Sequence, residues 1–159
     1  MRTSFTTETV VGVNASKLTI NEAHVDASGS FEANLLWRHA VVFGPYADYY
    51  GNVKTDVAYA KQYNTLVFDL YASEDSNAAI MLGLVNYNRY DFGVENTAVK
   101  YYDLDGNQTT YQEGKWIRVV VDLSALTSVN GDDALILLGV GAANSYIAIA
   151  NAYYSETKI

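Results

Sequence analysis

Hydrophobic and polar residues alternate with a period of two along much of the chain. In the run Tyr63–Ala72, Leu66, Phe68 and Leu70 fall on one face and Asp69 falls on the other. This is the period of a β-strand, whose successive side chains point to opposite faces. Three further runs show the same pattern: Ala79–Tyr87, Trp116–Leu123 and Ser145–Tyr154. We predict four strands here, and the run from Ala79 should be central because both of its faces are apolar.

Weaker strand patterns fill most of the remaining chain. They are Thr7–Val13, Lys17–Val25, Ser30–Phe43, Arg89–Glu95, Val99–Asp103 and Ala134–Gly141. Asp105-Gly106-Asn107 predicts a hairpin turn, because glycine and asparagine tolerate positive φ. Asp56–Gln62 contains helix formers but is short and uncapped, so we predict no helix there. About ten short strands in one domain predict an all-β protein, either a two-sheet antiparallel β-sandwich or a barrel.

Composition limits the classes of function. The 159 residues suit one domain, 1–159, and carry a net charge of −8, opposite to that of most nucleic-acid-binding proteins. The chain has no Cys, which excludes disulfides and thiolate chemistry, and its two His are too few for a histidine-rich metal site. No apolar run approaches the roughly 20 residues that a membrane helix needs. We therefore expect no nucleic-acid partner and no membrane span.

Tyrosine is the unusual component, with 14 Tyr against 5 Phe and 2 Trp. A buried tyrosine hydroxyl needs a hydrogen-bond partner, so an excess of Tyr favours half-exposed sheet faces or binding surfaces. The N-terminal run Met1–Phe5 has no apolar core of a signal peptide. The chain is then either cytoplasmic or a module of a larger secreted protein, and its low basic content and abundant Tyr and Asn favour the secreted module.

Three runs resemble strands of β-jelly-roll carbohydrate-binding modules. Leu66–Ala72 (LVFDLYA) is similar to their "tl.fdlYa" strand, and Gly114–Ser124 (GKWIRVVVDLS) to their "G.W..v.vdls" strand. Tyr146–Tyr154 (YIAIANAYY) is similar to their final "i.iDnvyl" strand. The runs follow in the family's order and spacing, and the resemblance covers the chain from Tyr63 to its C-terminal end.

The resemblance implies a jelly-roll sandwich that is a non-catalytic module of a secreted or cellulosomal enzyme. Such modules bind polysaccharide on a concave sheet face or at loops on the sandwich edge, and a catalytic domain is covalently attached. Many also hold a structural calcium, often through an acidic residue in the last strand. This chain has Asn151 at that place. We predict no cofactor, and a structural calcium stays an open alternative without a clear motif.

Two segments combine the aromatic rings and polar groups that a sugar needs, rings for its C–H faces and polar groups for its hydroxyls. The first runs from Gly44 to Asn52, where a tyrosine loop could stack on sugars or could lie as a lid over the core. The second runs from Asn86 to Phe92 and could bind sugar or could be a plain hairpin with Arg89 paired to Asp91. The predicted ligand-binding residues are Tyr46, Tyr49, Tyr50, Asn86, Tyr87, Asn88, Arg89, Tyr90, Asp91 and Tyr101.

Other aromatic and charged residues fit structural roles better. We expect Trp116 to pack in the sandwich, and Arg118 and Asp122 either to pair with each other or to line a groove. Asp103–Asn107 superficially resembles a calcium loop, but its spacing does not fit an EF-hand and a hairpin turn explains it better. We find no motif for a catalytic site.

The sequence therefore predicts a monomeric, extracellular module that binds a neutral plant cell-wall β-glycan, such as β-glucan, glucomannan or xyloglucan. An acidic polysaccharide would be repelled by the net charge of −8. Two alternatives stay open. One is a small jelly-roll polysaccharide hydrolase or lyase, and the other is a surface domain that binds protein.

Overall fold

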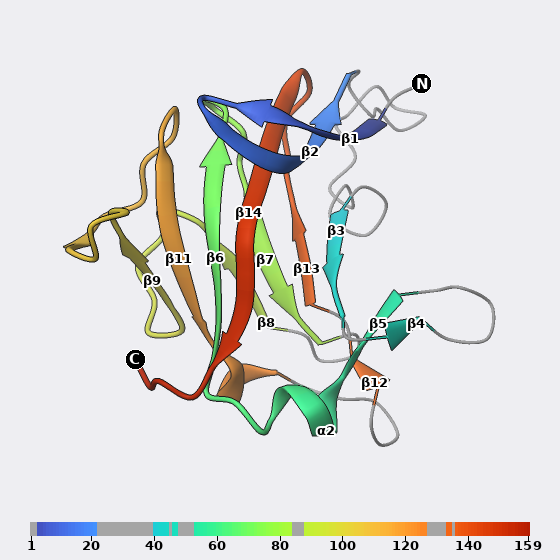
Figure 1. Ribbon diagram of the computed structural model, residues 1–159, viewed down its shortest axis with the longest axis vertical. Coiled ribbons are helices and arrows are strands. Elements are labelled where there is room, and N and C mark those ends of the chain that lie inside the picture. Colours follow the sequence, from blue (N-terminus) through green and yellow to red (C-terminus); the bar gives the residue numbers. More distant parts are fainter. Residues whose placement is uncertain are drawn as a thin grey trace.

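Seven strands form the larger of two sheets that face each other in the computed structural model (Figure 1). The structure describes residues 3–21, 40–44, 46–47, 53–83, 88–126, 133–134 and 136–159. The paired strands of this sheet are all antiparallel. Their order across the sheet is β1 (Thr3–Val10), β2 (Val13–Ile20), β14 (Ser145–Ser155), β6 (Thr65–Ala72), β11 (Trp116–Asp122), β9 (Val99–Tyr102) and β10 (Gln108–Thr109).

The facing sheet has four strands, and its order makes the fold a jelly roll. They are β3 (Ala40–Phe43), β13 (Ile136–Gly139), β7 (Ala79–Leu82) and β8 (Asn88–Asp91). The chain crosses between the two sheets after β2, β3, β6, β8, β11 and β13, so β2-β14-β6-β11 faces β3-β13-β7-β8, the arrangement of a double-sheet jelly roll. The predicted all-β, two-sheet antiparallel β-sandwich of jelly-roll type is confirmed.

Short elements extend this sandwich at one end. A small sheet has the order β12 (Asp133–Ala134), β5 (Val53–Asp56) and β4 (Tyr46–Ala47). One helical turn, α2 (Val57–Ala60), follows β5, and a 3₁₀ turn, η1 (Leu123–Ala125), follows β11. The prediction of no helix within Asp56–Gln62 is therefore wrong, because residues 57–60 form this one helical turn. Neither helix of the described segments is long and apolar enough to cross a membrane.

The alternation seen in the sequence builds the core between the two sheets. Leu66, Phe68 and Leu70 of β6 point inward beside the inward residues of β11, as predicted. The facing sheet contributes Ile80, Leu82, Ile136 and Leu138 to the same cluster. In β7 the other face is buried as well, at Ala79 and Met81. This strand lies between β13 and β8, so its predicted central position is confirmed.

The N-terminal strands form a hairpin that the sequence did not predict. The expected strands Thr7–Val13 and Lys17–Val25 are wrong, because the chain turns at Val11 (φ 42°) and Gly12 (φ 79°) and residues 3–10 pair with 13–20. Two consecutive positive φ angles define a type I′ turn, which usually contains Asn-Gly or Asp-Gly. Here a valine occupies the first turn position, so the sequence lacks the usual indication of a type I′ turn.

The tip of this hairpin packs on the outer face of the larger sheet, where it covers the side chain of Trp116. The Trp116 indole Nε1 donates a hydrogen bond to the Val10 carbonyl oxygen, at 2.9 Å. Trp116 and Val10 form a small second core with Ala15, Ala148 and Ala150, on the outer face of the larger sheet. The predicted packing role of Trp116 is confirmed, and the hairpin covers one end of this face (Figure 1).

Several other predicted boundaries hold within a few residues. The hairpin turn at Asp105–Asn107 joins β9 to β10, with Gly106 at φ 92°. Asp103 accepts hydrogen bonds there from the backbone N–H groups of residues 105 and 107, so its carboxylate is used by the turn. The strand expected over Ser30–Phe43 is observed at Ala40–Phe43, and its earlier residues lie outside the described ones.

Candidate functional site

Half of the residues predicted to bind a ligand lie where the structure gives no side-chain information. Tyr49, Tyr50, Asn86 and Tyr87 lie outside the described residues. Tyr46 lies in β4, but its side chain is not among those described. Their role in binding stays a prediction.

The predicted residues of β8 make the contacts of a structural edge strand. Arg89 Nη2 lies 2.7 Å from Asp91 Oδ1, and both side chains are exposed. Tyr90 packs against the core, and Asn88 Nδ2 donates to the Ala125 carbonyl oxygen at 2.8 Å. These are the contacts of the plain hairpin that the sequence left open as an alternative. The pair at Arg89 remains accessible to a ligand but is already satisfied.

Tyr101 lies largely in the core, although it also lines a surface pocket of about 370 Å³ beside Tyr111. Its side chain is only 9% exposed, and its ring centroid lies 5.4 Å from that of Tyr111 and 5.9 Å from that of Phe92. Burial raises the pKa of its hydroxyl, which accepts a hydrogen bond from the Gly93 N–H. The strand's alternation turns Tyr102, rather than Tyr101, to the outer face, and the binding role of Tyr101 stays a prediction.

The outer face of the larger sheet carries a polar network at its centre. Arg118 on β11 lies opposite Asp69 on β6, with Nε 2.9 Å from Oδ1 and Nη2 3.4 Å from Oδ2. Asn151 Nδ2 donates to the same Oδ2 at 3.0 Å. The hydrogen bond to Asp69 raises the pKa of the guanidinium, so Arg118 stays charged. The Asp69 side chain is 7% exposed and that of Arg118 is 32% exposed.

The expected pairing of Arg118 with Asp122 is wrong for a geometric reason. Residues four apart in a strand lie about 13 Å apart, whereas directly opposite residues on neighbouring strands are in contact. Asp122 instead accepts a hydrogen bond from the Ser124 N–H and caps the 3₁₀ turn. The other predicted role was lining a groove. Arg118 lines a pocket on the outer face, and Asp122 is not among the residues that line it.

A β-bulge in β14 brings Asn151 to this network. The register with β6 shifts between Ala150 and Tyr153, and Asn151 adopts a φ of 53°. Asparagine tolerates this left-handed conformation better than most residues, and the extra residue reverses the alternation beyond it. As a result Tyr153, opposite Val67, points outward, whereas Tyr154, opposite Leu66, packs against the core.

Aromatic side chains flank the network on both sides along the strands. On one side Tyr71 and Tyr146 stack with ring centroids 6.0 Å apart and planes 6° apart, and Lys17 Nζ lies 4.2 Å from the Tyr146 ring centre. On the other side Tyr153 is 52% exposed. A pocket of about 310 Å³ lies beside Tyr153, lined also by Val67, Tyr102, Arg118, Val120 and the C-terminal residues 157–159. We call Asp69, Arg118, Asn151, Tyr102, Tyr153 and this pocket the outer-face site.

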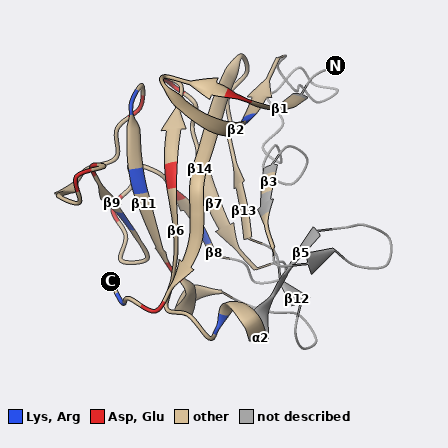
Figure 2. Ribbon diagram, viewed as in Figure 1, with Lys and Arg blue, Asp and Glu red and all other residues tan. Residues whose placement is uncertain are grey.

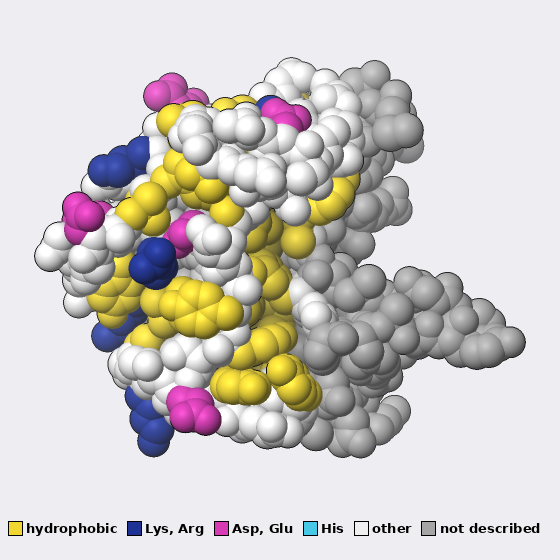
Figure 3. Space-filling view, viewed as in Figure 1, with side chains coloured by type: hydrophobic (Ala, Val, Ile, Leu, Met, Phe, Trp, Pro, Cys, Tyr) yellow, Lys and Arg dark blue, Asp and Glu magenta, His cyan; other side chains and the backbone are white. Residues whose placement is uncertain are grey.

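The surface around this site is apolar with few charges. Figure 2 shows basic and acidic positions side by side on β11 and β6, and β14 carries no charged residue. In Figure 3 hydrophobic side chains gather around these charges on the exposed face of the sheet. Asp69 neutralises Arg118 at the centre of the site, and Lys158 adds a positive charge among the residues that line the pocket.

This arrangement can bind a hydroxylated ring without chemical reaction. Exposed tyrosine rings present apolar faces, while the remaining Arg118 N–H groups can donate to hydroxyl oxygens. The Asn151 Oδ1 can accept from a hydroxyl. Within the described segments no three His, Cys, Asp or Glu residues come together as a metal site would need.

Sequence reasoning placed some of these residues correctly but missed the site. The period of two assigned Asp69 and Tyr71 to one face and Arg118 to one face of its own strand, as observed. It could not show that β6 and β11 are neighbours or that β14 contains a bulge, so Tyr153 was overlooked. A polar Asn inside an otherwise apolar final strand was the available signal. Comparison of the chain with protein-family models, curated proteins and solved structures gives no match.

Proposed function

We propose that this protein is a non-catalytic carbohydrate-binding module that binds a neutral plant cell-wall β-glycan at the outer-face site. The observation that carries the proposal is the position of an exposed tyrosine, Tyr153, beside a guanidinium whose charge is already balanced by Asp69. Sugar rings combine C–H faces with hydroxyl rims, so they match a surface of this composition.

The Arg118–Asp69 pair at the centre of the site favours a neutral ligand. Arg118 forms its ion pair with Asp69, so binding a carboxylated sugar would require Arg118 to exchange one carboxylate for another. The whole chain carries −8, which repels polyanions. A neutral glycan avoids both costs, which supports β-glucan, glucomannan or xyloglucan as the class of ligand.

The jelly-roll strand order and the exposed position of the site support binding without catalysis. The outer-face site lies on a sheet surface that is open to a polymer rather than in an enclosed cavity (Figure 3). Its one carboxylate, Asp69, is held by two hydrogen-bonding partners. A glycosidase needs two carboxyl groups on either side of the scissile bond, one of them free to act as an acid. We therefore propose a targeting module, secreted as part of a larger enzyme.

Affinity electrophoresis in gels that contain soluble polysaccharides tests this proposal. β-Glucan, xyloglucan, glucomannan, xylan and pectin are compared for wild type and for Tyr153→Ala, which removes an exposed ring without disturbing the core. Arg89→Ala is the matched control, because Arg89 is exposed, paired with a neighbouring acid and located on the other sheet. Circular dichroism verifies that each variant is folded.

We expect one neutral glycan class to retard wild type and Arg89→Ala, and Tyr153→Ala to migrate freely in it. Retardation that is lost in Arg89→Ala but kept in Tyr153→Ala would move the site to β8, the position that the sequence predicted. A wild type that no glycan retards would overturn the proposed function itself.

A further inference from the structure

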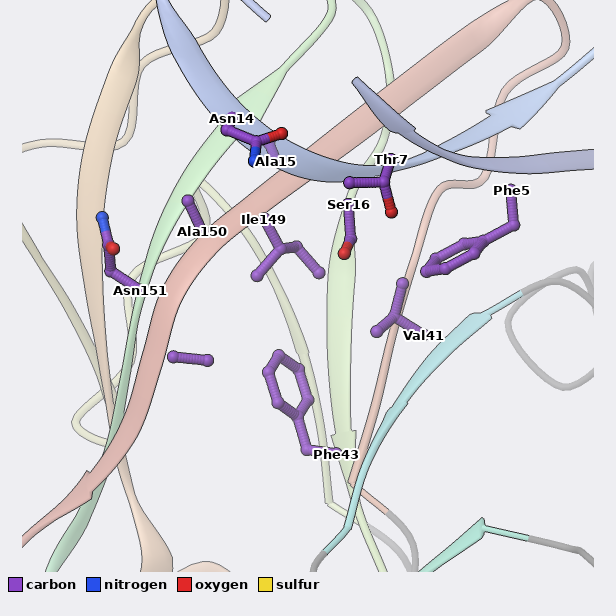
Figure 4. Close-up of a pocket in the computed structure, with 11 residues that line it drawn as sticks. Phe5, Thr7, Asn14, Ala15, Ser16, Val41, Phe43, Ile149, Ala150 and Asn151 are labelled. Carbon is purple, nitrogen blue, oxygen red and sulfur yellow. The ribbon is translucent and has the colours of Figure 1, made fainter. Parts of the chain in front are cut away.

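A second pocket lies on the other side of β14, between that strand and the facing sheet. Strand β2 pairs with β14 only as far as Ile149, so the later residues of β14 have no strand neighbour on that side in the described part of the chain. The opening is about 420 Å³ and reaches from the β1–β2 hairpin to β3 (Figure 4). We call it the β14–β3 slot.

The slot is built from two kinds of neutral side chain. Phe5 on β1 and Phe43 on β3 supply aromatic rings, and Phe5 is 58% exposed. In Figure 4 Thr7 and Ser16 direct their hydroxyl oxygens into the space. Asn151 lines the β14 wall of the slot, while its side-chain amide is bonded to Asp69 on the outer face. None of the described residues that line the slot is charged.

The slot continues toward the outer-face site. A smaller pocket of about 210 Å³ adjoins it and shares Phe43 and Ala152 with it. The same small pocket is also lined by Tyr153, which belongs to the outer-face site. The three spaces therefore follow one another around the bulged edge of β14, and the described residues that line the two on the slot side are all uncharged.

We infer that the β14–β3 slot is a second segment of the glycan site and that the ligand is an extended, neutral glycan bound along its interior. The chain would run over the outer-face site, pass Tyr153 and continue into the slot between Phe5 and Phe43. This inference rests on the proposed function. It adds that recognition needs several consecutive sugar units rather than one unit or a chain end.

The chemistry of the slot supports a sugar over a purely apolar occupant. Two aromatic rings can stack on the C–H faces of a pyranose, and the hydroxyl groups of Thr7 and Ser16 can replace the water around its rim. The volume of the slot falls within the range of roughly 300–1,000 Å³ that is usual for small-molecule sites. The uncharged lining found among the described residues matches the neutral ligand already proposed for the outer face.

Calorimetric titration with cello- and manno-oligosaccharides, from the disaccharide to the octasaccharide, tests the inference. The proteins are wild type, Tyr153→Ala and Phe5→Ala, with Val94→Ala as the control for loss of an exposed hydrophobic side chain outside the slot. In wild type we expect affinity to keep rising with chain length. Phe5→Ala should bind short oligosaccharides like wild type but bind the longest ones roughly tenfold more weakly.

Each outcome separates the two claims. If Phe5→Ala follows wild type at every length while Tyr153→Ala fails to bind, the outer-face site is supported and the slot is rejected. Wild-type affinity that stops rising at the trisaccharide also rejects the slot. If wild type binds none of the oligosaccharides and is retarded by no polysaccharide, the proposed function fails and the slot fails with it.

Discussion

Arg118 and Asp69 form a two-point ion pair across neighbouring strands at the centre of the outer sheet face, with Nε 2.9 Å from Oδ1. Asp69 is almost completely buried, while Arg118 keeps part of its guanidinium exposed. A buried carboxylate is stable only when its hydrogen bonds are made, so Arg118 both supports the sheet and presents donors to solvent. The same pair therefore stabilises the sheet and supplies the donors that the proposed binding uses.

Removing Arg118 should destabilise the protein more than removing an exposed arginine. In Arg118→Met the Asp69 carboxylate keeps only the Asn151 amide, and we expect a loss of about 2 kcal/mol of unfolding free energy. The control Arg89→Met breaks a solvent-exposed pair and should cost less than about 1 kcal/mol. Urea unfolding measures both. Equal losses in the two variants would show that Asp69 does not depend on Arg118.

The bulge at Asn151 should respond to backbone and side-chain changes separately. Asn151→Gly keeps the positive φ and loses only the amide bond to Asp69, which should cost about 1 kcal/mol. Asn151→Ala loses the same bond and also strains the left-handed backbone, for about 1 kcal/mol more. The expected order of thermal stability is therefore wild type, then Gly, then Ala. An alanine variant as stable as the glycine variant would argue against backbone strain at this position.

Local periodicity predicted the sandwich well, because each strand of the larger sheet must bury one face. The inward residues of β6 and β11 were assigned correctly from alternation alone. The hairpin at Val11–Gly12 was missed because its first turn residue is a valine, which rarely adopts positive φ. An alternation pattern describes one strand at a time, and the residues Val11-Gly12 do not have the sequence of a common hairpin turn.

The candidate site depends on relationships that a single strand does not contain. Arg118 meets Asp69 only because β11 lies beside β6, although the two residues are far apart in sequence. Tyr153 reaches the outer face only because one extra residue at the bulge reverses the alternation. Strict alternation from Ile147 and Ile149 would have placed Tyr153 inward and Tyr154 outward, the opposite of what is observed.

The hydrogen bond from Trp116 should hold the N-terminal hairpin on the sheet. Trp116→Phe keeps an aromatic ring but removes the N–H that reaches the Val10 carbonyl oxygen. We expect a loss of about 1 kcal/mol and faster amide hydrogen exchange in β1 and β2 than in β6. Tyr71→Phe, which alters a hydroxyl beside the same ring, is the control. Unchanged exchange in the hairpin would mean that apolar packing alone holds it.

Alkaline pH should destabilise the fold through its buried tyrosines. Burial raises the pKa of Tyr101 and of Tyr154 above the ordinary value of 10.0. Above about pH 10 the unfolded chain releases these protons while the folded chain retains them. Stability is therefore fully present below this pH and is lost as the pH rises through the folded-state values. Urea unfolding as a function of pH, with tyrosinate absorbance recorded in parallel, measures this loss.

Tyr154→Phe isolates one of these groups. The Tyr154 hydroxyl is buried and has no hydrogen-bond partner within the described segments. Its ring stacks on that of Tyr63, with the ring centroids 5.7 Å apart. Replacing it with Phe keeps the ring and removes an unsatisfied polar group, so we expect a gain of roughly 1 kcal/mol at neutral pH. The variant should also lose less stability than wild type between neutral pH and pH values above 10.0. A variant that is less stable at neutral pH would indicate a hydrogen bond to this hydroxyl, and an unchanged alkaline slope would assign the loss to other tyrosines.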